Sequence, residues 1–318
     1  MSQGSVEPAC RQVVSCIMFE ASYIQAARNG VLNDRISEAY GRMESCSLCP
    51  RNCKINRNKD KLGICKTGKL AIVSSYHPHF GEESTLVGTG GSGTIFFTNC
   101  NLLCNFCQNY DISHRGVGEE VSDKQLAGMM VYLQNKGCQN INFVTPSHVI
   151  PQILSALSIA IDKGLNIPLV YNTGGYDSVE SLKLLENIVD IYMPDLKLLS
   201  VQSARKCGIP LDYPDIVKNA ILEMHRQVGD LKINNQGIAL RGLLVRHLVL
   251  PNNINNGEES MRFLAREVSK NTYVNIMSQY HPCFMAMGVS ELDRTITNNE
   301  FRETHKAAHR NGLNRLDK

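Results

Sequence analysis

Three cysteines in one short stretch, Cys100, Cys104 and Cys107, have the spacing C-x3-C-x2-C. Cysteine thiolates are soft, anionic donors that suit iron, and a loop with three of them can hold a 4Fe–4S cluster while one iron keeps an open position. An open position can bind a small molecule, so the spacing favours catalysis over electron storage. The alternatives left by the spacing are a three-cysteine zinc site and a group of buried, reducible thiols.

A second group of cysteines precedes the first. Cys46, Cys49, Cys53 and Cys65 follow the spacing C-x2-C-x3-C-x11-C in a stretch that is poor in apolar residues and cannot bury a core of its own. A bound metal would order this stretch. Zinc and a second 4Fe–4S cluster both accept four thiolates, so the sequence does not choose between them, and unliganded thiols are the remaining alternative.

Apolar stretches of strand length alternate with amphipathic stretches of helix length after residue 90. The first, residues 94–98, is β-branched and aromatic and predicts a buried strand that ends just before Cys100. Strands are also predicted at 140–144, 167–171, 188–193, 243–249 and 272–279, and helices at 124–136, 149–163, 179–187, after Pro214 and at 258–270. This alternation predicts an α/β fold with a parallel sheet, and six units can curl into a partial barrel with the site at its carboxyl edge.

Local signals mark several boundaries. The helix at 124–136 begins at a capping box, Ser122-x-x-Gln125. A hairpin is predicted around residues 233–239. The tract YHPHF, which contains two histidines, is interpreted as a turn in preference to a metal site.

Four regions follow from this pattern: a helical lead-in at 1–45 with helical stretches at 16–28 and 33–43, a Cys-rich metal-binding segment at 46–90, the barrel at 91–290, and a C-terminal helix and tail at 291–318. The C-terminal helix is predicted to begin at a second capping box, Thr297-x-x-Glu300.

Composition describes a globular protein that does not bind nucleic acid. The 318 residues are 43% hydrophobic and 20% charged, and the net charge is only +3 with no Lys/Arg-rich run. The first twenty residues lack the features of a secretory signal and no stretch of eighteen apolar residues follows, so a cytoplasmic location without a membrane anchor is expected. Twelve cysteines in a reducing compartment favour metal or redox chemistry over disulfides.

The motifs around the cysteines resemble those of a known family. GSGTIFFTNC, CQNYDIS, NFVTPSH, MPDLK and NIMSQYHP, in this order, are similar to the radical S-adenosylmethionine (SAM) superfamily, in the branch related to pyruvate formate-lyase activating enzymes. The resemblance covers roughly residues 46–282. It implies a partial (βα)6 barrel with a small Cys-rich N-terminal segment. It also implies an oxidoreductase that reductively cleaves SAM to a 5′-deoxyadenosyl radical and abstracts a hydrogen atom from a substrate, which in activating enzymes is a glycyl radical enzyme.

The resemblance also implies which residues meet the cofactors. The three cysteines of the loop would hold the 4Fe–4S cluster, with Phe106 beside the cofactor; a core aromatic is the alternative for Phe106. Many members carry Gly-Gly-Glu after the second strand, where the amino group of SAM binds. This chain departs from that pattern with Thr145-Pro146-Ser147-His148, in which Thr145 and Ser147 are the candidates for the contact.

Later strand ends would hold the rest of SAM. Asn172-Thr173 aligns with an Asp-Thr pair of the activating enzymes, and Asp195 and Lys197 align with their Met-x-Asp-x-Lys. In the family these residues surround a monovalent cation and hold the ribose and carboxylate of SAM. Asn172 lacks the charge of the Asp that it replaces, which puts the cation site in doubt. A salt-bridged strand end on the surface is the alternative for Asp195 and Lys197.

Two further candidates would neutralise the SAM carboxylate. Arg246 and His281 stand where the family places such groups, and a structural histidine is the alternative for His281. The implied partners are SAM, an electron donor such as flavodoxin or ferredoxin, and a protein substrate. The competing functions are a non-catalytic or electron-transfer iron–sulfur protein and a zinc-stabilised binding module.

Overall fold

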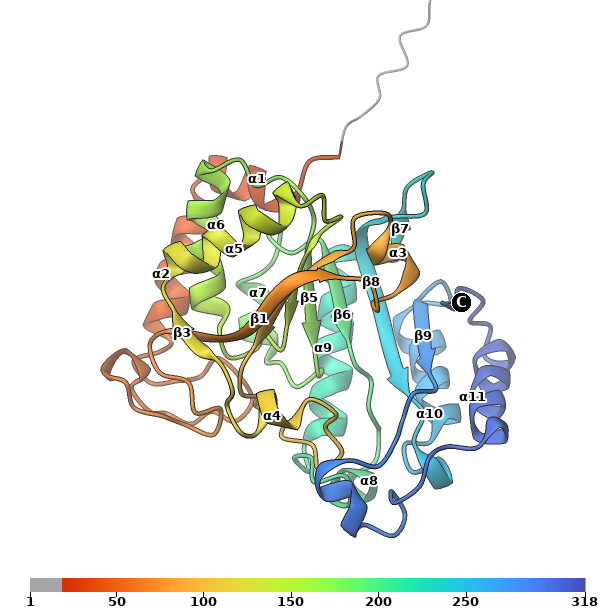
Figure 1. Cartoon of the computed structure of the whole chain (residues 1–318). Coiled ribbons are helices and arrows are strands. Elements are labelled where there is room, and N and C mark those ends of the chain that lie inside the picture. The colour runs from red at the N-terminus through yellow and green to blue at the C-terminus, as the bar shows by residue number, and fades with distance from the viewer. Residues whose placement is uncertain (1–18, 318) are drawn as a thin grey trace, which may run out of the picture.

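A curved sheet forms the centre of the protein, for which a computed structural model describes residues 19–317 (Figure 1). Six of its strands run parallel, in the order β2-β4-β5-β6-β8-β9. They are β2 (Ser92–Phe97), β4 (Ile141–Val144), β5 (Leu169–Thr173), β6 (Ile191–Pro194), β8 (Ala239–Leu248) and β9 (Tyr273–Met277). The six predicted strands and the α/β partial barrel are therefore confirmed.

Helices between the strands cover the outer face of the sheet (Figure 1). They are α5 (Asp123–Asn135), α6 (Ile150–Asp162), α7 (Val179–Lys183), α8 (Val201–Lys206), α9 (Tyr213–Val228) and α10 (Gly257–Phe263), which continues as a π-helix at Leu264–Val268. The Ser122–Gln125 capping box of α5 is present with both of its hydrogen bonds. Helix α7 is shorter than predicted, and the turns after it include Asn187 at a φ of 62°.

Helices also lie at both ends of the described chain. α1 (Ser22–Arg28) and α2 (Val31–Gly41) form the lead-in, and α2 packs on α6. The predicted helical stretch began at residue 16, and residues 16–18 lie outside the described range. α11 (Asn298–Arg310) begins at the predicted Thr297–Glu300 capping box. No helix in residues 19–317 is long and apolar enough to cross a membrane.

Antiparallel strands extend the sheet at its edges. β1 (Ala71–His79) pairs with β2, and β3 (Glu119–Val121) pairs with β1. The tract YHPHF contributes to β1, so its interpretation as a turn was wrong. Pro78 is tolerated because β3 pairs only with residues 71–73, which leaves the Pro78 end of β1 bonded on one side. At the other edge, β7 (Lys232–Ile233) forms the predicted hairpin with β8.

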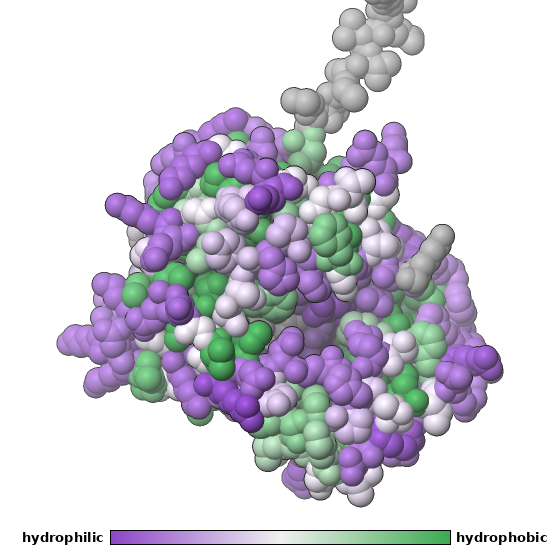
Figure 2. All heavy atoms as spheres, in the orientation of Figure 1, coloured by the Kyte–Doolittle hydropathy of each residue, from purple (hydrophilic) through white to green (hydrophobic). Residues whose placement is uncertain are grey.

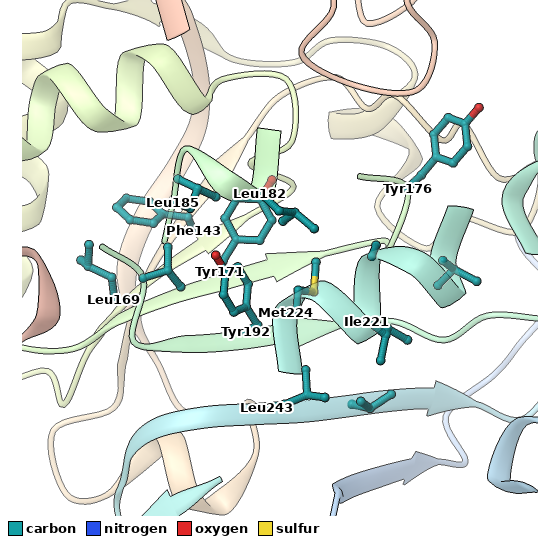
Figure 3. Close-up of a cluster of buried hydrophobic side chains, with 14 of the residues drawn as sticks. Phe143, Leu169, Tyr171, Tyr176, Leu182, Leu185, Tyr192, Ile221, Met224 and Leu243 are labelled. Carbon is teal, nitrogen blue, oxygen red and sulfur yellow. The ribbon is translucent and has the colours of Figure 1, made fainter. Parts of the chain in front are cut away.

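A row of aromatic side chains joins the sheet to its helices (Figure 3). Phe143, Tyr171 and Tyr192 are in register on β4, β5 and β6, and the Tyr171 and Tyr192 rings meet edge to face with centroids 5.7 Å apart. Figure 3 shows them beside Leu182 of α7 and Met224 of α9. Burial of rings of this size contributes about 1.5–3 kcal/mol each.

Side chains on the other face of the same strands point into the barrel. Val170, Ile191 and Leu244 belong to a separate buried cluster on this face. Successive side chains alternate across a strand, so the residues two positions later, such as Asn172 after Val170 and Arg246 after Leu244, lie on the same face. The interior therefore changes from apolar to polar toward the carboxyl ends of the strands.

Candidate functional site

The cysteine loop (Cys100, Cys104, Cys107) leaves the carboxyl end of β2 and lines a cavity of about 260 Å³. Figure 2 shows the molecule hollowed near the middle of the face drawn there. Asn99 and Leu103 bend the loop with φ angles of 69° and 59°. The short helix α4 (Tyr110–Ser113) follows, and the backbone N–H of Asn99 donates to the carbonyl of Ile112 at 2.9 Å. The bends turn all three thiols toward one space.

Burial and nearby dipoles set the properties of these thiols. Burial raises the pKa of Cys100, although the N–H groups of Leu103 and Leu102 act in the opposite direction. Burial also raises the pKa of Cys104, against the attraction of the Lys197 ammonium. The hydroxyl of Ser113 donates to the sulfur of Cys107 at 3.1 Å. Without a metal the buried thiols would be protonated, so a cationic centre is what would make them good ligands.

A polar wall (Asn172, Asp195, Lys197, Arg246) lines the same cavity. Asp195 accepts from Lys197 Nζ at 2.7 Å and from Arg246 Nε at 2.8 Å. Arg246 Nη2 also donates to Asn172 Oδ1 at 2.7 Å. The side chains of Asp195, Lys197 and Arg246 are only 15–18% exposed, so this is not the exposed salt bridge that the sequence left open.

The polar wall is charged, and its two cations are paired with Asp195 in the cavity and with Glu82 beside it. Burial alone would raise the pKa of Asp195, but Arg246 and Lys197 together lower it below the usual value. Burial would lower the pKa of Lys197, but Asp195 and Cys104 raise it. The charged residues that line the cavity are these two cations and one carboxylate. The ammonium and the guanidinium each have more N–H groups than Asp195 and Asn172 accept, so both can also donate to a carboxylate of a ligand.

Thr145 and Thr173 line the cavity, whereas Ser147 does not. Thr145 has a φ of 62°, an uncommon conformation for a β-branched residue, and its N–H donates to the carbonyl of Asn172 at 2.8 Å. The hydroxyls of Ser147 and Thr173 lie 3.1 Å apart, and Thr173 Oγ1 donates to Asp177 Oδ2 at 2.6 Å. The buried carboxylate of Asp177 thus fixes the Thr173 hydroxyl, with Ser147 as a neighbour.

Phe106 lines the cavity, is 4% exposed, and packs against Tyr280 with ring centroids 6.2 Å apart. His281 does not line it. The His281 ring is exposed, and its Nδ1 lies 3.3 Å from Gln108 Nε2. Gln108 itself lines the cavity, so His281 reaches the site through Gln108.

Three residues near the site were not predicted individually. Ser113 ends the motif CQNYDIS, so its position in that motif was the available signal. Asp177 follows Asn172-Thr173 by only a few residues and is a buried acid with three hydroxyl neighbours. Glu82, whose Oε2 lies 3.7 Å from Arg246 Nη1, comes from the segment after β1 and carries no sequence signal.

The four-cysteine pocket (Cys46, Cys49, Cys53, Cys65) is separate from this cavity. Its thiols surround a space of about 10 Å³. Burial raises the pKa of Cys49 to about 12, although hydrogen bonds from the Arg51 backbone and the Asn101 side chain lower it. Across residues 19–317, no three or more His, Cys, Asp or Glu side chains are arranged to hold a single metal ion.

The donors around the larger cavity fit a 4Fe–4S cluster with a polar ligand beside it. Three thiols on one loop supply three of the four positions that such a cluster offers. The cations of the polar wall face the same space and suit a carboxylate. The thiols and the cation donors therefore lie in one cavity, in an arrangement that fits a cluster with a small carboxylate-bearing ligand beside it.

Sequence comparison finds the same kind of protein. Residues 94–264, more than half of the chain, match the family model described as the radical SAM superfamily. The uncharacterized protein MJ0674 of Methanocaldococcus jannaschii is 29% identical over 304 residues, which are 93% of this chain and 83% of that protein.

Structure comparison finds a similar fold in HydG. HydG, a maturase of the FeFe-hydrogenase, superposes with a TM-score of 0.50 at 12% identity, over 70% of this chain. The chain spans about half of HydG, 49% of its length, so the likeness concerns the fold alone. The cobalamin-dependent SAM radical enzyme OxsB gives a TM-score of 0.37 at 15% identity, over 70% of this chain and 31% of OxsB.

Proposed function

The chain belongs to the radical SAM superfamily, and we propose that the cysteine loop and the polar wall are the site at which it holds the 4Fe–4S cluster and SAM of that superfamily. When bound, these cofactors supply a 5′-deoxyadenosyl radical that removes a hydrogen atom from a substrate. The observation that carries the proposal is that the three thiols and the polar wall line one cavity.

The cysteine loop would supply three thiolates and leave one position open to SAM. Lys197 lines the same cavity as this loop, and its charge lowers the pKa of both Cys100 and Cys104. Its charge favours the thiolate form, which is the form that binds iron. Ser113 would support the third ligand, because its hydroxyl donates to the sulfur of Cys107.

The polar wall would hold the amino-acid end of SAM. Arg246 and Lys197 offer two cations to the carboxylate, and Asp195 fixes the orientation of both. Asn172 supports Arg246 through its side-chain oxygen. Because these groups are ordered before a ligand arrives, binding would cost little reorganisation.

Other lining residues would position the ligand and exclude water. Phe106 presents a buried aromatic face to the cavity. Thr173 donates to Asp177, which fixes its hydroxyl. The hydroxyl of Ser147 lies 3.1 Å from that of Thr173, so Ser147 would affect the ligand only through Thr173. His281 would act from outside through Gln108.

The finer proposal is an activating-enzyme type of reaction on a glycine of a partner protein, with flavodoxin or ferredoxin as the electron donor and the cytoplasm as the location. Its support is the resemblance of MPDLK and NIMSQYHP to the activating enzymes. A glycyl radical in a co-incubated partner protein would give an electron paramagnetic resonance (EPR) signal that is lost on exposure to air. A partner with no radical signal, incubated under conditions in which SAM is cleaved, would refute the finer proposal alone.

SAM cleavage tests the general proposal. Anaerobically reconstituted protein with dithionite should form 5′-deoxyadenosine and methionine from SAM. Cys104→Ala and Lys197→Met should abolish the product, whereas Cys138→Ala, which replaces a buried cysteine outside both groups, should not. Wild-type protein that carries a reducible cluster but forms no 5′-deoxyadenosine would favour the electron-transfer alternative.

A further inference from the structure

A buried arginine lies against the four-cysteine pocket. Arg57 is 1% exposed and lines this pocket together with the four thiols. Its guanidinium donates to the carbonyl of Gly68 through Nε at 3.2 Å and Nη2 at 3.0 Å, and to the carbonyl of His148 through Nη1 at 2.7 Å. No carboxylate in residues 19–317 forms a salt bridge with it.

A buried cation without a counter-charge is unfavourable, because neutral carbonyls replace only part of the hydration that it loses. Arg57 therefore indicates that the pocket beside it holds an anion. Four thiolates around a metal centre outweigh the positive charge of that centre, so a loaded four-cysteine pocket is anionic. The positive charge of Arg57 is thus balanced if the pocket holds a metal centre, and it is not balanced if the pocket holds four neutral thiols.

The space between the thiols favours a cluster over a single zinc ion. Zinc binds thiolates at about 2.3 Å, which would bring the four sulfurs to about 3.8 Å from one another and leave no void between them. The pocket instead encloses about 10 Å³, roughly the space of one water-sized sphere. Its side chains are also not arranged as ligands of one ion, as stated above for the described residues.

Glycine and strained backbone shape this pocket. An added Cβ at Gly63 would lie 2.9 Å from the sulfur of Cys53, so only glycine lets the chain approach this closely. Asn52, Lys54 and Lys66 have positive φ angles of 45°, 56° and 49°. Such conformations persist when the surroundings impose them. A small buried cluster that includes Cys46, Leu48 and Met43 packs on one side of this segment, and a bound centre would hold the thiols on the other.

We propose that the four-cysteine pocket binds a second iron–sulfur cluster, that Arg57 is its buried counter-charge, and that this cluster passes an electron to the cysteine loop. The electron-transfer part rests on the proposed function. Residues 46–65 form the loops at the lower left of Figure 1, and Arg51 in these loops donates to backbone carbonyls of the cysteine loop.

Contacts between the two cysteine groups support the transfer. Arg51 lines the four-cysteine pocket, and it donates to the carbonyls of Asn101 at 2.7 Å and Leu102 at 3.2 Å. The N–H of Leu102 in turn lies 3.4 Å from the sulfur of Cys100. Asn101 contacts the thiol of Cys49 and directly follows Cys100 in the chain. Arg51, Asn101 and Leu102 therefore connect the two cysteine groups.

The step is a one-electron exchange. A one-electron donor protein reduces the second cluster by one electron and is itself oxidised by one. The second cluster then returns to its oxidised state as the cluster of the cysteine loop gains that electron. No bond is formed or broken, and no proton moves.

Iron analysis and EPR of anaerobically reconstituted protein test the site. A Cys100→Ala/Cys104→Ala/Cys107→Ala variant should keep about half of the wild-type iron and a reducible cluster signal that SAM does not alter. Cys49→Ala/Cys65→Ala should keep the other half, with a signal that SAM does alter. Loss of all iron from the first variant, or zinc in place of iron, would overturn the inference and leave the proposed function standing. Full wild-type iron in the first variant would instead refute the proposed function.

Arg57 variants test the counter-charge without removing a ligand. Arg57→Gln should lower the reduction potential of the second cluster, because reduction adds negative charge that the guanidinium stabilises. Arg57→Lys should keep the potential closer to that of the wild type. Arg42→Gln is the control, since Arg42 pairs with Glu38 on α2 and does not line the pocket. Equal potentials for Arg57→Gln and wild type would exclude Arg57 as the counter-charge.

Reduction kinetics test the transfer. In Cys49→Ala/Cys65→Ala, the cluster of the cysteine loop should be reduced at least tenfold more slowly by reduced flavodoxin than in the wild type. A wild-type rate with flavodoxin would show that the electron does not pass through the four-cysteine pocket. Equal slowing of reduction by dithionite and by flavodoxin would also contradict the transfer, because it would indicate damage to the cysteine loop.

Discussion

Replacing Asp195 with asparagine removes the only carboxylate among the charged residues that line the larger cavity. Asparagine keeps the shape of the side chain and one acceptor oxygen. It leaves Lys197 and Arg246, which now donate to Asp195 at 2.7 and 2.8 Å, without their shared anion. Arg246 keeps Glu82 at 3.7 Å, so Lys197 is the cation that loses its carboxylate partner.

The cost follows from burial and charge. At an effective dielectric constant of about 20, each ion pair at about 4 Å between charges contributes about 4 kcal/mol before desolvation is subtracted. Removing one partner of a buried pair costs about 3–5 kcal/mol, because the charge left behind is uncompensated. The Asp195 side chain is 15% exposed, so water in the cavity would relieve part of this cost. We therefore expect a loss of about 3 kcal/mol in the free energy of unfolding, a large part of the 5–15 kcal/mol typical of folded proteins.

Urea unfolding followed by circular dichroism under reducing conditions measures this loss. Asp111→Asn is the matched control, because Asp111 pairs with Arg115 at the same 2.7 Å but the two side chains are 55% and 62% exposed. An exposed pair contributes about 0–1 kcal/mol. If Asp195→Asn lowered the free energy of unfolding no more than Asp111→Asn, the claim that the charges of the polar wall depend on one another would be refuted.

Four further substitutions have defined outcomes. Gly63→Ala should lower the iron content of the four-cysteine pocket, measured by iron analysis, because the added Cβ would contact the Cys53 sulfur. Gly128→Ala in α5, where an added Cβ meets nothing within 4 Å, should instead raise the free energy of unfolding by about 0.5–1 kcal/mol, measured by thermal unfolding. Ser122→Ala should cost about 1 kcal/mol in urea unfolding because it removes the capping box of α5, and an unchanged midpoint would contradict that role. Burial raises the pKa of Asp190 to about 6 from its usual 3.8, although hydrogen bonds from Ser22 and Leu169 act in the opposite direction. The folded state therefore keeps a proton that the unfolded state has lost, so stability should fall by about 3 kcal/mol as pH rises from about 4 to 6, and Asp190→Asn should remove this slope.

Local patterns were sufficient to predict most of the fold. Helix α5 could be predicted because it begins at a capping box and apolar residues recur along one face. β2 could be predicted from its run of β-branched and aromatic residues. β1 could not be predicted, because apolar and polar residues do not alternate clearly in its tract of serines, histidines and a proline. Pairing with β2 and β3 stabilises this strand. Such pairing is a long-range property that a local pattern does not carry.

The candidate site was predicted where residues follow strand ends and missed where contacts are long-range. Asp195 and Lys197 were found because MPDLK follows a predicted strand. The burial of Arg57 was not predicted, because the residues around it are mostly polar and an arginine in such a stretch ordinarily lies on the surface. Its partners are the carbonyls of Gly68 and His148, 11 and 91 residues away. His281 does not line the cavity. Its Nδ1 lies 3.3 Å from Nε2 of Gln108, and Gln108 lines the cavity.

EPR of the reduced protein with and without SAM tests the central claim most directly, because it observes the cluster itself. SAM should change the spectrum of the reduced cluster in wild-type protein and in Cys49→Ala/Cys65→Ala, where the cysteine loop holds the only remaining cluster. The change should be absent in Lys197→Met, which lacks a cation of the polar wall. A wild-type spectrum that SAM leaves unaltered would contradict the assignment of the cysteine loop and the polar wall as the site of the cluster and SAM.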